Sequence, residues 1–412
     1  MTTATISRRP RAAAKGGWPV IPAARRGGLR PAIARGLLSW MAARLPIRIV
    51  MPDGTSSGSG GAGAPVLQLH DPGAFFARVG GGAAGFAESY MAGEWDSDDL
   101  PGLFTAFATH LPSLVPAPLR AFRRLYVPPR PAEQEATVDG ARRNIEHHYD
   151  LSNAFFELFL DPTLTYSSAL FAEGDTLEQA QLRKIDRLLD ATGTGAGTRL
   201  LEIGTGWGEL ALRAAERGAS VTSLTISPAQ YEVATRRAAE AGLAGRIDVR
   251  LRDYREAEGR YDAVVSVEMI EAVGARYWPA YFGTIDRVLA PGGRAGIQAI
   301  TMPHDQMLAT MNGQTWIHQY IFPGGQIPSL RAMTNVLASH TDLRITSDLA
   351  MGDHYARTLS AWRARFSAAD DDVEALGFSR PFQRMWDLYL AYSQAGFAAG
   401  YLDVHQLVLE RP

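Results

Sequence analysis

The sequence predicts an α/β protein in which a smaller N-terminal α/β accessory domain precedes a doubly wound, mostly parallel sheet. Three observations predict this fold. Apolar strand segments alternate with helical segments of about 10–15 residues after residue 199, which favours parallel pairing of the strands. A glycine-rich turn joins the first of these strands to its helix. A Pro-rich polar stretch divides the 412 residues, a length that suits two or three domains of roughly 100–200 residues each.

The chain begins with a basic segment. Residues 1–30 are rich in Ala, Gly and Pro, and every charged side chain before Asp53 is cationic, so a disordered basic tail is expected. Residues 31–45 place apolar side chains near helical spacing beside Arg35 and Arg44. That pattern fits a helix on an anionic membrane surface, and it equally fits the first packed helix of a domain. Arginines interrupt the tail where a secretory signal peptide would carry its apolar stretch, so secretion is not expected.

The region 31–125 predicts the accessory domain. Its expected elements are strands at residues 47–51 and 65–70, a flexible Gly/Ser-rich loop at 55–64 between them, and a helix at 71–79. Asp71 is expected to cap that helix. A linker follows at 126–139, and residues 140–412 are expected to form the larger domain.

The larger domain carries the regular alternation. Its expected strands lie at residues 199–203, 220–224, 247–251, 261–267 and 294–300, with two closing strands at 343–349 and 402–409. Its expected helices lie at 209–218, 228–242, 277–289 and 381–397. Residues 312–329 show no clean period. They are expected to form a lid or channel segment, with Gly324 and Gly325 permitting a tight turn.

Composition excludes several classes of function. The net charge of −2 excludes a globally basic nucleic-acid binder, so no nucleic acid partner is expected. The absence of cysteine excludes disulfides, thiolate nucleophiles and thiolate metal ligands, and it fits a reducing cytosol. The sequence has no run of 18 apolar residues, so no membrane-spanning helix is expected. His147 and His148 lack a second cluster with ligand spacing, so no metal site is expected.

The turn after the first strand of the larger domain predicts a ligand site. It reads LLEIGTGWGEL, and its three glycines let a ligand approach the backbone where a helix begins with free N–H groups. The spacing differs from the dinucleotide fingerprint G-x-G-x-x-G. Glu202 stands two residues before the first glycine. This form resembles the nucleoside-binding turn of class I S-adenosylmethionine-dependent methyltransferases, and Asp253 and Tyr254 fit the place where that fold contacts adenine.

Several longer stretches together resemble the cyclopropane-fatty-acyl-phospholipid synthase family. They are NIEHHYDLSNAFFELFLDPTLTYSSALF, LEIGTGWGEL, VTSLTISPAQ, DYR, YDAVVSVEMIEAVG and TWIHQYIFPGGQIPS. The resemblance implies a seven-stranded class I sheet and methylation by S-adenosylmethionine of a cis double bond in a phospholipid acyl chain. It also implies bicarbonate as general base and, in some members, a homodimer formed through the small domain. A cytoplasmic protein, peripheral to the inner face of the membrane, is expected.

The resemblance assigns roles to individual residues. Those matched to the cofactor site are Tyr166, Ser167, Glu202, Gly204, Gly206, Gly208, Thr225, Ser227, Gln230, Asp253 and Tyr254. Glu271 matches the carboxylate near the bicarbonate, and Tyr355 matches the tyrosine of that site. The family's usual cysteine, histidine and second cysteine are here Ser168, Gln298 and Ser393.

These departures bear on the product. The wording QAITMPH around the substituted histidine also occurs in branches that make 10-methylene or 10-methyl acyl chains. Cyclopropane and methylene-branched products both stay open, and so does a reductase partner that would saturate a methylene.

The chemistry itself sets requirements for the site. An alkene is a weak nucleophile, so the methyl donor must be held in line with it, and water must be excluded from the carbocation that results. Aromatic faces stabilise such a cation. The candidates, each of which also fits ordinary core, are Phe155, Phe156, Phe159, Trp316, Tyr320 and Phe322. A base then removes a proton. We expect Glu271 and Tyr355 to hold bicarbonate, with neutral hydrogen bonds from Ser168 and Gln298.

Two other functions remain as alternatives. One is a small-molecule methyltransferase on the same fold, and the other is a lipid-binding relative that has lost catalysis. The aromatic segment 312–328 and the basic N-terminus favour the acyl-chain enzyme over the first, because a soluble substrate requires neither. The complete glycine turn with Glu271 and Tyr355 argues against the second.

Overall fold

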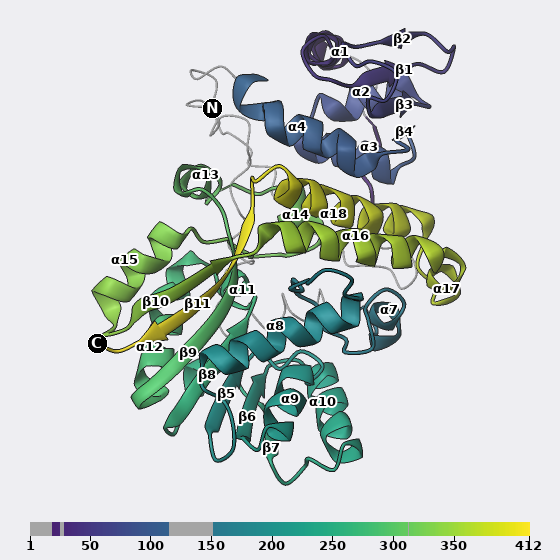
Figure 1. Ribbon diagram of the computed structural model, residues 1–412. Helices are drawn as coiled ribbons and strands as arrows, with labels where there is room; N and C mark the ends of the chain where they lie inside the picture. Colours follow the sequence, from purple (N-terminus) through teal and green to yellow (C-terminus); the bar gives the residue numbers. More distant parts are fainter. Residues whose placement is uncertain (1–18, 25–28, 115–150, 312) are drawn as a thin grey trace, which may run out of the picture.

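The computed structural model describes residues 19–24, 29–114, 151–311 and 313–412 (Figure 1). Most of the predicted basic tail, the linker at 126–139 and the pair His147–His148 lie outside the described residues. Two sheets are present within the described part, and they lie at opposite ends of the molecule with helices between them.

The larger sheet has seven strands in the order β10-β11-β9-β8-β5-β6-β7. Their bounds are β5 Arg199–Ile203, β6 Ser220–Thr225, β7 Ile247–Leu251, β8 Tyr261–Val267, β9 Leu289–Thr301, β10 Arg344–Ala350 and β11 Asp403–Glu410. Strands β5 to β9 pair in parallel, whereas β11 runs antiparallel to both of its neighbours. The predicted doubly wound, mostly parallel sheet is confirmed.

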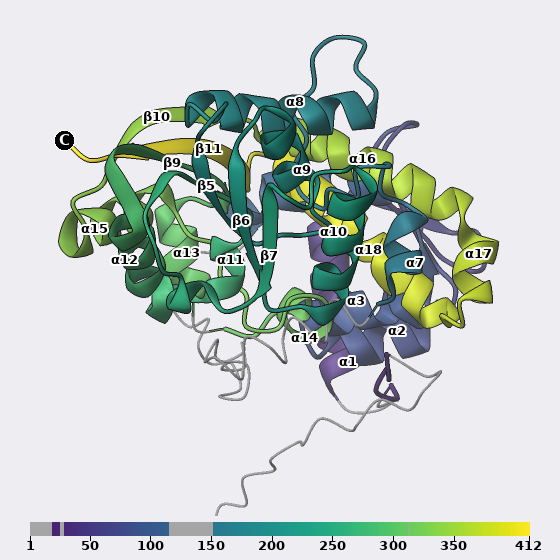
Figure 2. The ribbon, with the colours of Figure 1, turned by 90° about the horizontal axis from the view of Figure 1, so that it is seen from below.

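Helices cover both faces of this sheet (Figure 2). One face carries α8 (Leu177–Ala191), α9 (Glu209–Glu216) and α10 (Pro228–Glu240), and the other carries α12 (Trp278–Val288) and α15 (Leu330–His340). Their starts follow from capping side chains. Ser227 accepts the amide of Gln230 at the start of α10, and Thr176 forms a capping box with Gln179 at the start of α8. Because the chain winds both ways from β5, the carboxyl ends of β5 to β9 share one edge.

The N-terminal sheet has the order β2-β1-β3-β4. The elements of this unit are α1 Leu29–Ala42, β1 Arg48–Val50, β2 Ser56–Ser57, β3 Val66–Leu69, α2 Pro72–Val79, α3 Ala83–Met91, β4 Trp95–Asp96 and α4 Leu100–Leu114. Asp71 caps α2 as expected, accepting the amide of Ala74 at 3.0 Å. Residues 55–64, expected as a flexible loop, are instead hydrogen-bonded to the chain around β1. Strand β2 pairs with β1, and the amide of Gly60 donates to the carbonyl of Ile47 at 3.1 Å.

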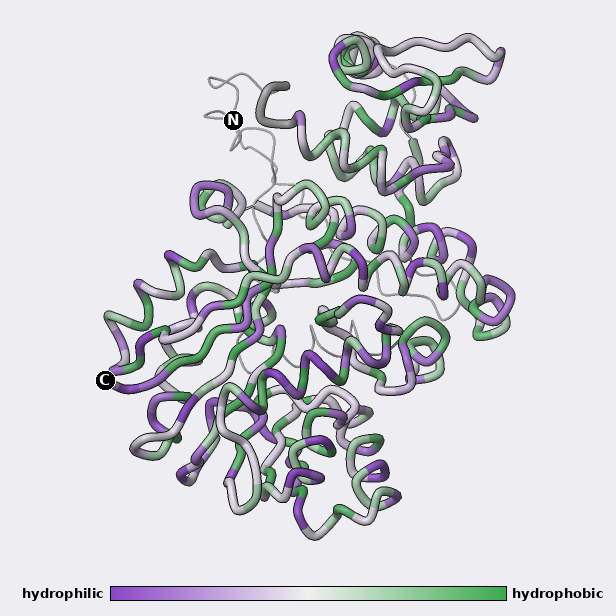
Figure 3. Tube along the Cα trace, in the orientation of Figure 1, coloured by the Kyte–Doolittle hydropathy of each residue, from purple (hydrophilic) through white to green (hydrophobic). Residues whose placement is uncertain are grey.

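Three helices between β10 and β11, two of them long, join the two sheets. They are α16 Gly352–Ala368, α17 Asp370–Ala375 and α18 Arg380–Ala398, with the short α7 Asn153–Glu157 beside them. Hydrophobic and hydrophilic stretches alternate along α16 and α18 (Figure 3). Helix α18 contacts α3 and α4 on the N-terminal side and α16 on the other. One hydrophobic core therefore extends from α1 to α18.

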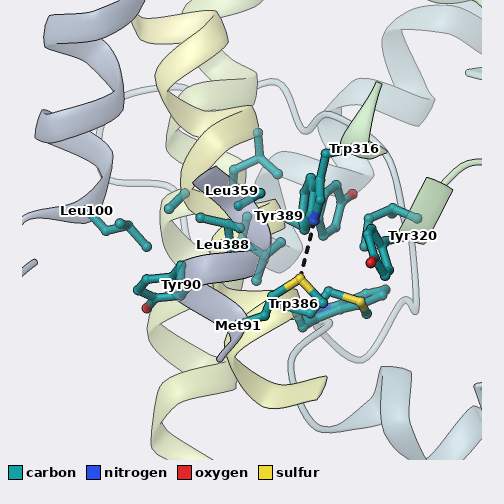
Figure 4. Close-up of a cluster of buried hydrophobic side chains, with 14 of the residues drawn as sticks. Tyr90, Met91, Leu100, Trp316, Tyr320, Leu359, Trp386, Leu388 and Tyr389 are labelled. Carbon is teal, nitrogen blue, oxygen red and sulfur yellow. Dashed lines mark hydrogen bonds between the residues drawn. The ribbon is translucent and has the colours of Figure 1, made fainter. Parts of the chain in front are cut away.

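The contact between the two units centres on a buried cluster (Figure 4). The indole N–H of Trp316 donates to the sulfur of Met91 at 3.3 Å, and the hydroxyl of Tyr90 donates to Asp387 at 2.8 Å. Trp316 begins α14 (Trp316–Tyr320), a short helix inside the predicted lid segment. The remaining short helices are η3 Tyr254–Glu256, α11 Ile270–Val273, η4 Ala275–Tyr277 and α13 His304–Thr310. Among the described residues, no helix combines the length and apolarity needed to cross a bilayer.

Candidate active site

A cavity of about 1330 Å³ runs from the N-terminal helices to the carboxyl edge of the larger sheet. Leu37 of α1 and Phe104 of α4 line its outer part, Trp316 lines its middle, and Gly204 and Glu268 line its inner end. Its walls are mostly apolar. Such a cavity, with a few polar groups at one end, is the usual form of a small-molecule site.

Most of the residues predicted for the cofactor site line this cavity. They are Tyr166, Ser167, Glu202, Gly204, Gly206, Thr225, Gln230, Asp253 and Tyr254. Gly208 and Ser227 do not line it and have structural surroundings instead. Ser227 caps α10. Gly208, which precedes α9, lies against Ala234 of α10, and a Cβ added to Gly208 would meet the Ala234 Cβ at 3.0 Å.

The glycine turn leaves a free approach to its backbone. Gly204 and Gly206 have φ of +98° and +53°, and these positive values are unfavourable for residues that carry a Cβ. A Cβ on Gly206 would meet nothing within 4 Å, so the space beside it belongs to the cavity. Glu202, under the turn, accepts the hydroxyl of Ser223, and burial raises the pKa of Glu202 to about 8. This cradle fits a nucleoside-bearing ligand.

The neighbouring strands add fixed polar groups at the same edge. At the end of β6, the Thr225 hydroxyl donates to the Gln230 side-chain oxygen at 2.8 Å. After β7, Asp253 accepts the guanidinium of Arg255 at 2.8 and 2.6 Å. Tyr254 follows it, and burial raises the pKa of Tyr254 to about 12, so its hydroxyl stays neutral. These groups hold one another in place beside the cavity.

Tyr166 and Ser167 reach the cavity from the loop before α8. The Tyr166 hydroxyl lies 2.8 Å from that of Tyr389, and its ring stacks on Trp362 with ring centres 5.2 Å apart. The Ser167 hydroxyl accepts the ammonium of Lys184 at 2.7 Å. Lys184 is fully buried, and desolvation lowers its pKa to about 8. The sequence analysis did not single out Lys184.

The predicted catalytic residues divide into two groups. Glu271, Tyr355 and Ser393 line the cavity, whereas Ser168 and Gln298 lie behind its wall. Glu271, in α11, accepts the backbone amide of Ile300 with one oxygen. Its other oxygen is buried without a hydrogen-bond partner among the described residues. Burial and the neighbouring charge of Glu268 raise the pKa of Glu271 to about 8.

Glu268 is a site residue that the sequence analysis missed. It follows β8 directly, lines the cavity and accepts both the backbone amide of Ser168 and the amide group of Gln298, each at 2.8 Å. The Tyr355 hydroxyl also hydrogen-bonds Glu268. Ser168 and Gln298 therefore bind this carboxylate, where we expected them to offer donors to bicarbonate. The available signal was a carboxylate at the carboxyl end of a parallel strand.

Aromatic rings surround the inner cavity. Of the six candidates, Trp316 and Phe322 line it. Tyr320 donates its hydroxyl to Glu88 at 2.9 Å, and the three phenylalanines of α7 and its flank are fully buried core. Further rings that line the cavity are Tyr166, Tyr355, Tyr389 and Phe397. Tyr355 packs on Phe397 with ring centres 4.6 Å apart, and burial raises the pKa of Tyr355 well above its usual value.

Known proteins resemble this chain along most of its length. The family model described as mycolic acid cyclopropane synthetase matches residues 137–407. The tuberculostearic acid methyltransferase UfaA1 of Mycobacterium tuberculosis is 49% identical over 406 residues, which cover 96% of this chain and 95% of that protein. The cyclopropane-fatty-acyl-phospholipid synthase of Escherichia coli is 34% identical over 345 residues, 82% of this chain and 86% of that protein.

Solved structures agree with the fold. The cyclopropane synthase MmaA2 from Mycobacterium tuberculosis has a TM-score of 0.61 at 33% identity, covering 65% of this chain and 97% of its own. The mycolic acid cyclopropane synthase CmaA1, complexed with SAH and CTAB, has a TM-score of 0.61 at 31% identity, covering 66% and 98%. The match spans a length close to that of the larger domain.

Proposed function

This chain belongs to the mycolic acid cyclopropane synthetase family and is an S-adenosylmethionine-dependent methyltransferase, and we propose that it methylates the cis double bond of an unsaturated acyl chain in a membrane phospholipid. The similar proteins are named for fatty acid and cyclopropane chemistry, which supports an unsaturated acyl chain as substrate. S-adenosylmethionine is the co-substrate.

The observation that carries the proposal is the shape and lining of this cavity. Its inner end holds the glycine turn and the polar groups that follow β6 and β7, which suit the nucleoside and amino acid parts of the co-substrate. Its outer part is lined by apolar side chains of α1, α3 and α4. An acyl chain fits that outer part because burying its methylene groups there removes apolar surface from water.

The outer surface supports a phospholipid rather than a free acid. On α1, Ile33 and Leu37 are 66% and 53% exposed, one helical turn apart, and Leu37 also lines the cavity. Arg35 is exposed on the same helix, and Arg44 is exposed in the turn that follows it. Exposed apolar side chains beside cations suit the interface of an anionic membrane, so the proposed route of the acyl chain runs from the bilayer past α1.

The chain's own residues divide the chemistry between them. When bound, S-adenosylmethionine supplies an electrophilic methyl group. The glycine turn and its neighbours orient that group toward the cavity, which makes proximity the main contribution. The rings of Tyr166, Phe322 and Tyr389 exclude water and offer their faces to a carbocation on the acyl chain. A carboxylate at the end of β8 is placed to accept the proton that must leave.

We propose a methylene-branched product. The relative with 49% identity is named a methyltransferase, whereas the one with 34% identity is named a cyclopropane synthase. The Gln298 segment carries the wording that the sequence analysis linked to 10-methylene and 10-methyl chains. A methylene needs a further reduction to become a methyl branch, which a separate reductase would supply.

The test uses purified protein, S-adenosylmethionine and vesicles of oleoyl phospholipid. The acyl chains are released and examined by mass spectrometry and proton NMR. We expect a gain of one carbon and two hydrogens, with vinylidene protons in the spectrum. Upfield cyclopropyl protons would show that the product is a cyclopropane and would contradict the methylene proposal. No gain with phospholipid, despite binding of S-adenosylmethionine measured by calorimetry, would contradict the acyl-chain proposal and favour a small-molecule substrate or a binding protein.

A further inference from the structure

We propose that Glu268 is the general base of the reaction and that its carboxylate takes the place that the family resemblance gives to bicarbonate. The inference rests on the proposed function for its substrate. Its structural part, the occupation of the anion site by the protein's own carboxylate, rests only on the contacts of Glu268.

The backbone is shaped to present this side chain. Glu268 has φ of +49°, and among the described residues Leu164 is the only other non-glycine residue with positive φ. Side chains disfavour this conformation, and where it persists it commonly marks a functional site. The amide of Glu268 donates to the carbonyl of Gln298 at 2.7 Å, which holds the residue at the end of the β8–β9 ladder. The carboxylate is thereby held at the wall of the cavity.

Four groups around Glu268 favour its ionised form. The backbone amide of Ser168 and the side-chain amide of Gln298 both donate to Oε1 at 2.8 Å. The hydroxyl of Tyr355 adds a hydrogen bond, and the buried ammonium of Lys184 adds an attractive charge. Donors of this kind stabilise a carboxylate and oppose the effect of burial, which raises the pKa of Glu268. The site is built for an anion, and the anion present is Glu268.

The orientation of Gln298 is fixed from a distance. Arg187 can only donate, and its guanidinium donates to the side-chain oxygen of Gln406 at 2.6 Å. The nitrogen of Gln406 therefore faces the oxygen of Gln298, at 3.0 Å. The nitrogen of Gln298 then faces Glu268, which must accept. This chain of hydrogen bonds explains why a glutamine suits position 298. Its neutral amide accepts from Gln406 on one side and donates to Glu268 on the other.

The two carboxylates have different surroundings. Glu271 has one backbone donor and one buried oxygen without a partner among the described residues, and its pKa is raised to about 8. Glu268 accepts two hydrogen bonds at 2.8 Å, from the backbone amide of Ser168 and from the side-chain amide of Gln298. At neutral pH Glu271 therefore keeps its proton, and the donors held around Glu268 make Glu268 the proposed proton acceptor of the pair. Such divergence within a carboxyl pair separates an acid from a base.

Bicarbonate does not fit this arrangement. The donors expected for it are engaged elsewhere: the Ser168 hydroxyl donates to the carbonyl of Ala169, and the Gln298 amide donates to Glu268 and to the carbonyl of Ser168. A second anion beside Glu268 would meet the negative charge of that carboxylate at short range, which is unfavourable in a cavity with few polar groups. No step of the reaction is therefore assigned to bicarbonate.

The proton transfer balances without another reactant. After the methyl group has joined one alkene carbon, a hydride shift places the positive charge on the carbon that bears it. A C–H bond of the added methyl breaks, its proton passes to the Glu268 carboxylate, and the electron pair of that bond forms the exocyclic double bond. The carboxylic acid then returns the proton to water. If the electron pair instead closes a ring before any hydride shift, the same base gives a cyclopropane.

The first experiment measures the anion site without lipid. Wild-type protein, Glu268→Gly and the exposed control Glu173→Gln are titrated with ¹³C-bicarbonate in carbon-dioxide-free buffer, with binding followed by NMR and by thermal shift. Glycine suits a positive φ, so Glu268→Gly is expected to fold. We expect saturable binding to Glu268→Gly and none to the other two. Saturable binding to the wild type would overturn the inference.

The second experiment measures turnover on oleoyl phospholipid vesicles. We expect wild-type turnover to be the same with and without bicarbonate, Glu268→Gln to lose at least about a hundredfold, and Glu268→Gly to regain at least about tenfold with bicarbonate or acetate. Loss of wild-type turnover when bicarbonate is removed would refute the inference while leaving the proposed function intact. An active Glu268→Gln variant would do the same. A wild type that methylates no lipid, with bicarbonate bound by Glu268→Gly alone, would refute the proposed function and support the occupied anion site.

Discussion

Replacing Gly208 and Gly206 by alanine tests which glycine of the turn serves the fold and which serves the ligand. Both have positive φ, +94° and +53°, yet their surroundings differ. A Cβ on Gly208 would lie 3.0 Å from the Cβ of Ala234 and 3.2 Å from its Cα, so α9 and α10 would have to move apart. A Cβ on Gly206 would project into the cavity and meet no atom within 4 Å.

The magnitudes follow from these distances. An L residue in the left-handed region costs about 1–2 kcal/mol, and the overpacking at Gly208 adds about 1–3 kcal/mol. The smaller entropy of the unfolded alanine chain returns about 0.4–1 kcal/mol in each variant. We therefore expect Gly208→Ala to lower the free energy of unfolding by about 2–4 kcal/mol, and Gly206→Ala by about 1 kcal/mol or less.

The assay pairs urea denaturation with calorimetric titration of S-adenosylmethionine. Gly206→Ala is expected to weaken binding at least about tenfold, or about 1.4 kcal/mol, while the folded fraction of Gly208→Ala binds within about threefold of wild type. Gly208→Ala as stable as the wild type would refute the packing argument. Unchanged affinity in Gly206→Ala would refute the assignment of that space to the co-substrate.

Three further predictions concern charge, membrane contact and the shared core. The pKa of Glu271 is raised from 4.5 to about 8, so the folded state holds a proton that the unfolded chain loses, and this stability is present below about pH 4.5 and lost as pH rises through about 8. Glu271→Gln should therefore gain about 2–4 kcal/mol relative to wild type between about pH 5 and pH 8 in urea denaturation, and a pH-independent difference would contradict that pKa. Leu37→Asp should lower co-sedimentation with anionic vesicles at least about fivefold relative to the α1 control Ser39→Asp, and equal losses in both would remove α1 as the contact. Met91→Ala should lower the free energy of unfolding by about 2–4 kcal/mol in one cooperative transition of both units, whereas two separate transitions would show that the core is not shared.

Local patterns predicted the larger sheet well. The strand bounds at 199–203, 247–251 and 261–267 agree with β5, β7 and β8, because short apolar runs between turn residues are strong local signals. The order and direction of these strands follow from the doubly wound rule. Helices α3, α4 and α16 were missed, since their buried faces contact residues far away in the sequence, as in the contacts of α18 with α3 and α4. The boundary of the accessory domain stays a prediction.

The candidate site was predicted unevenly for the same reason. The glycine turn and the residues after β6 and β7 lie next to recognisable elements, so their positions could be found locally. The role suggested for Glu268 depends on Ser168 and Gln298, which are 100 and 30 residues away in the sequence. The direction of the Gln298 amide depends on Gln406, 108 residues further along. Neither these contacts nor the positive φ of Glu268 leaves a mark in a single sequence.

The central claim is that this chain adds a methyl group to an acyl-chain double bond and then removes a proton from that same group. The most direct measurement uses S-adenosylmethionine with a trideuterated methyl group and vesicles of oleoyl phospholipid, with mass spectrometry of the released acyl chains. The account predicts a product that has gained one carbon and two deuterons, because the third deuteron passes to the base. A product that keeps all three deuterons, or no labelled acyl chain at all, would contradict it.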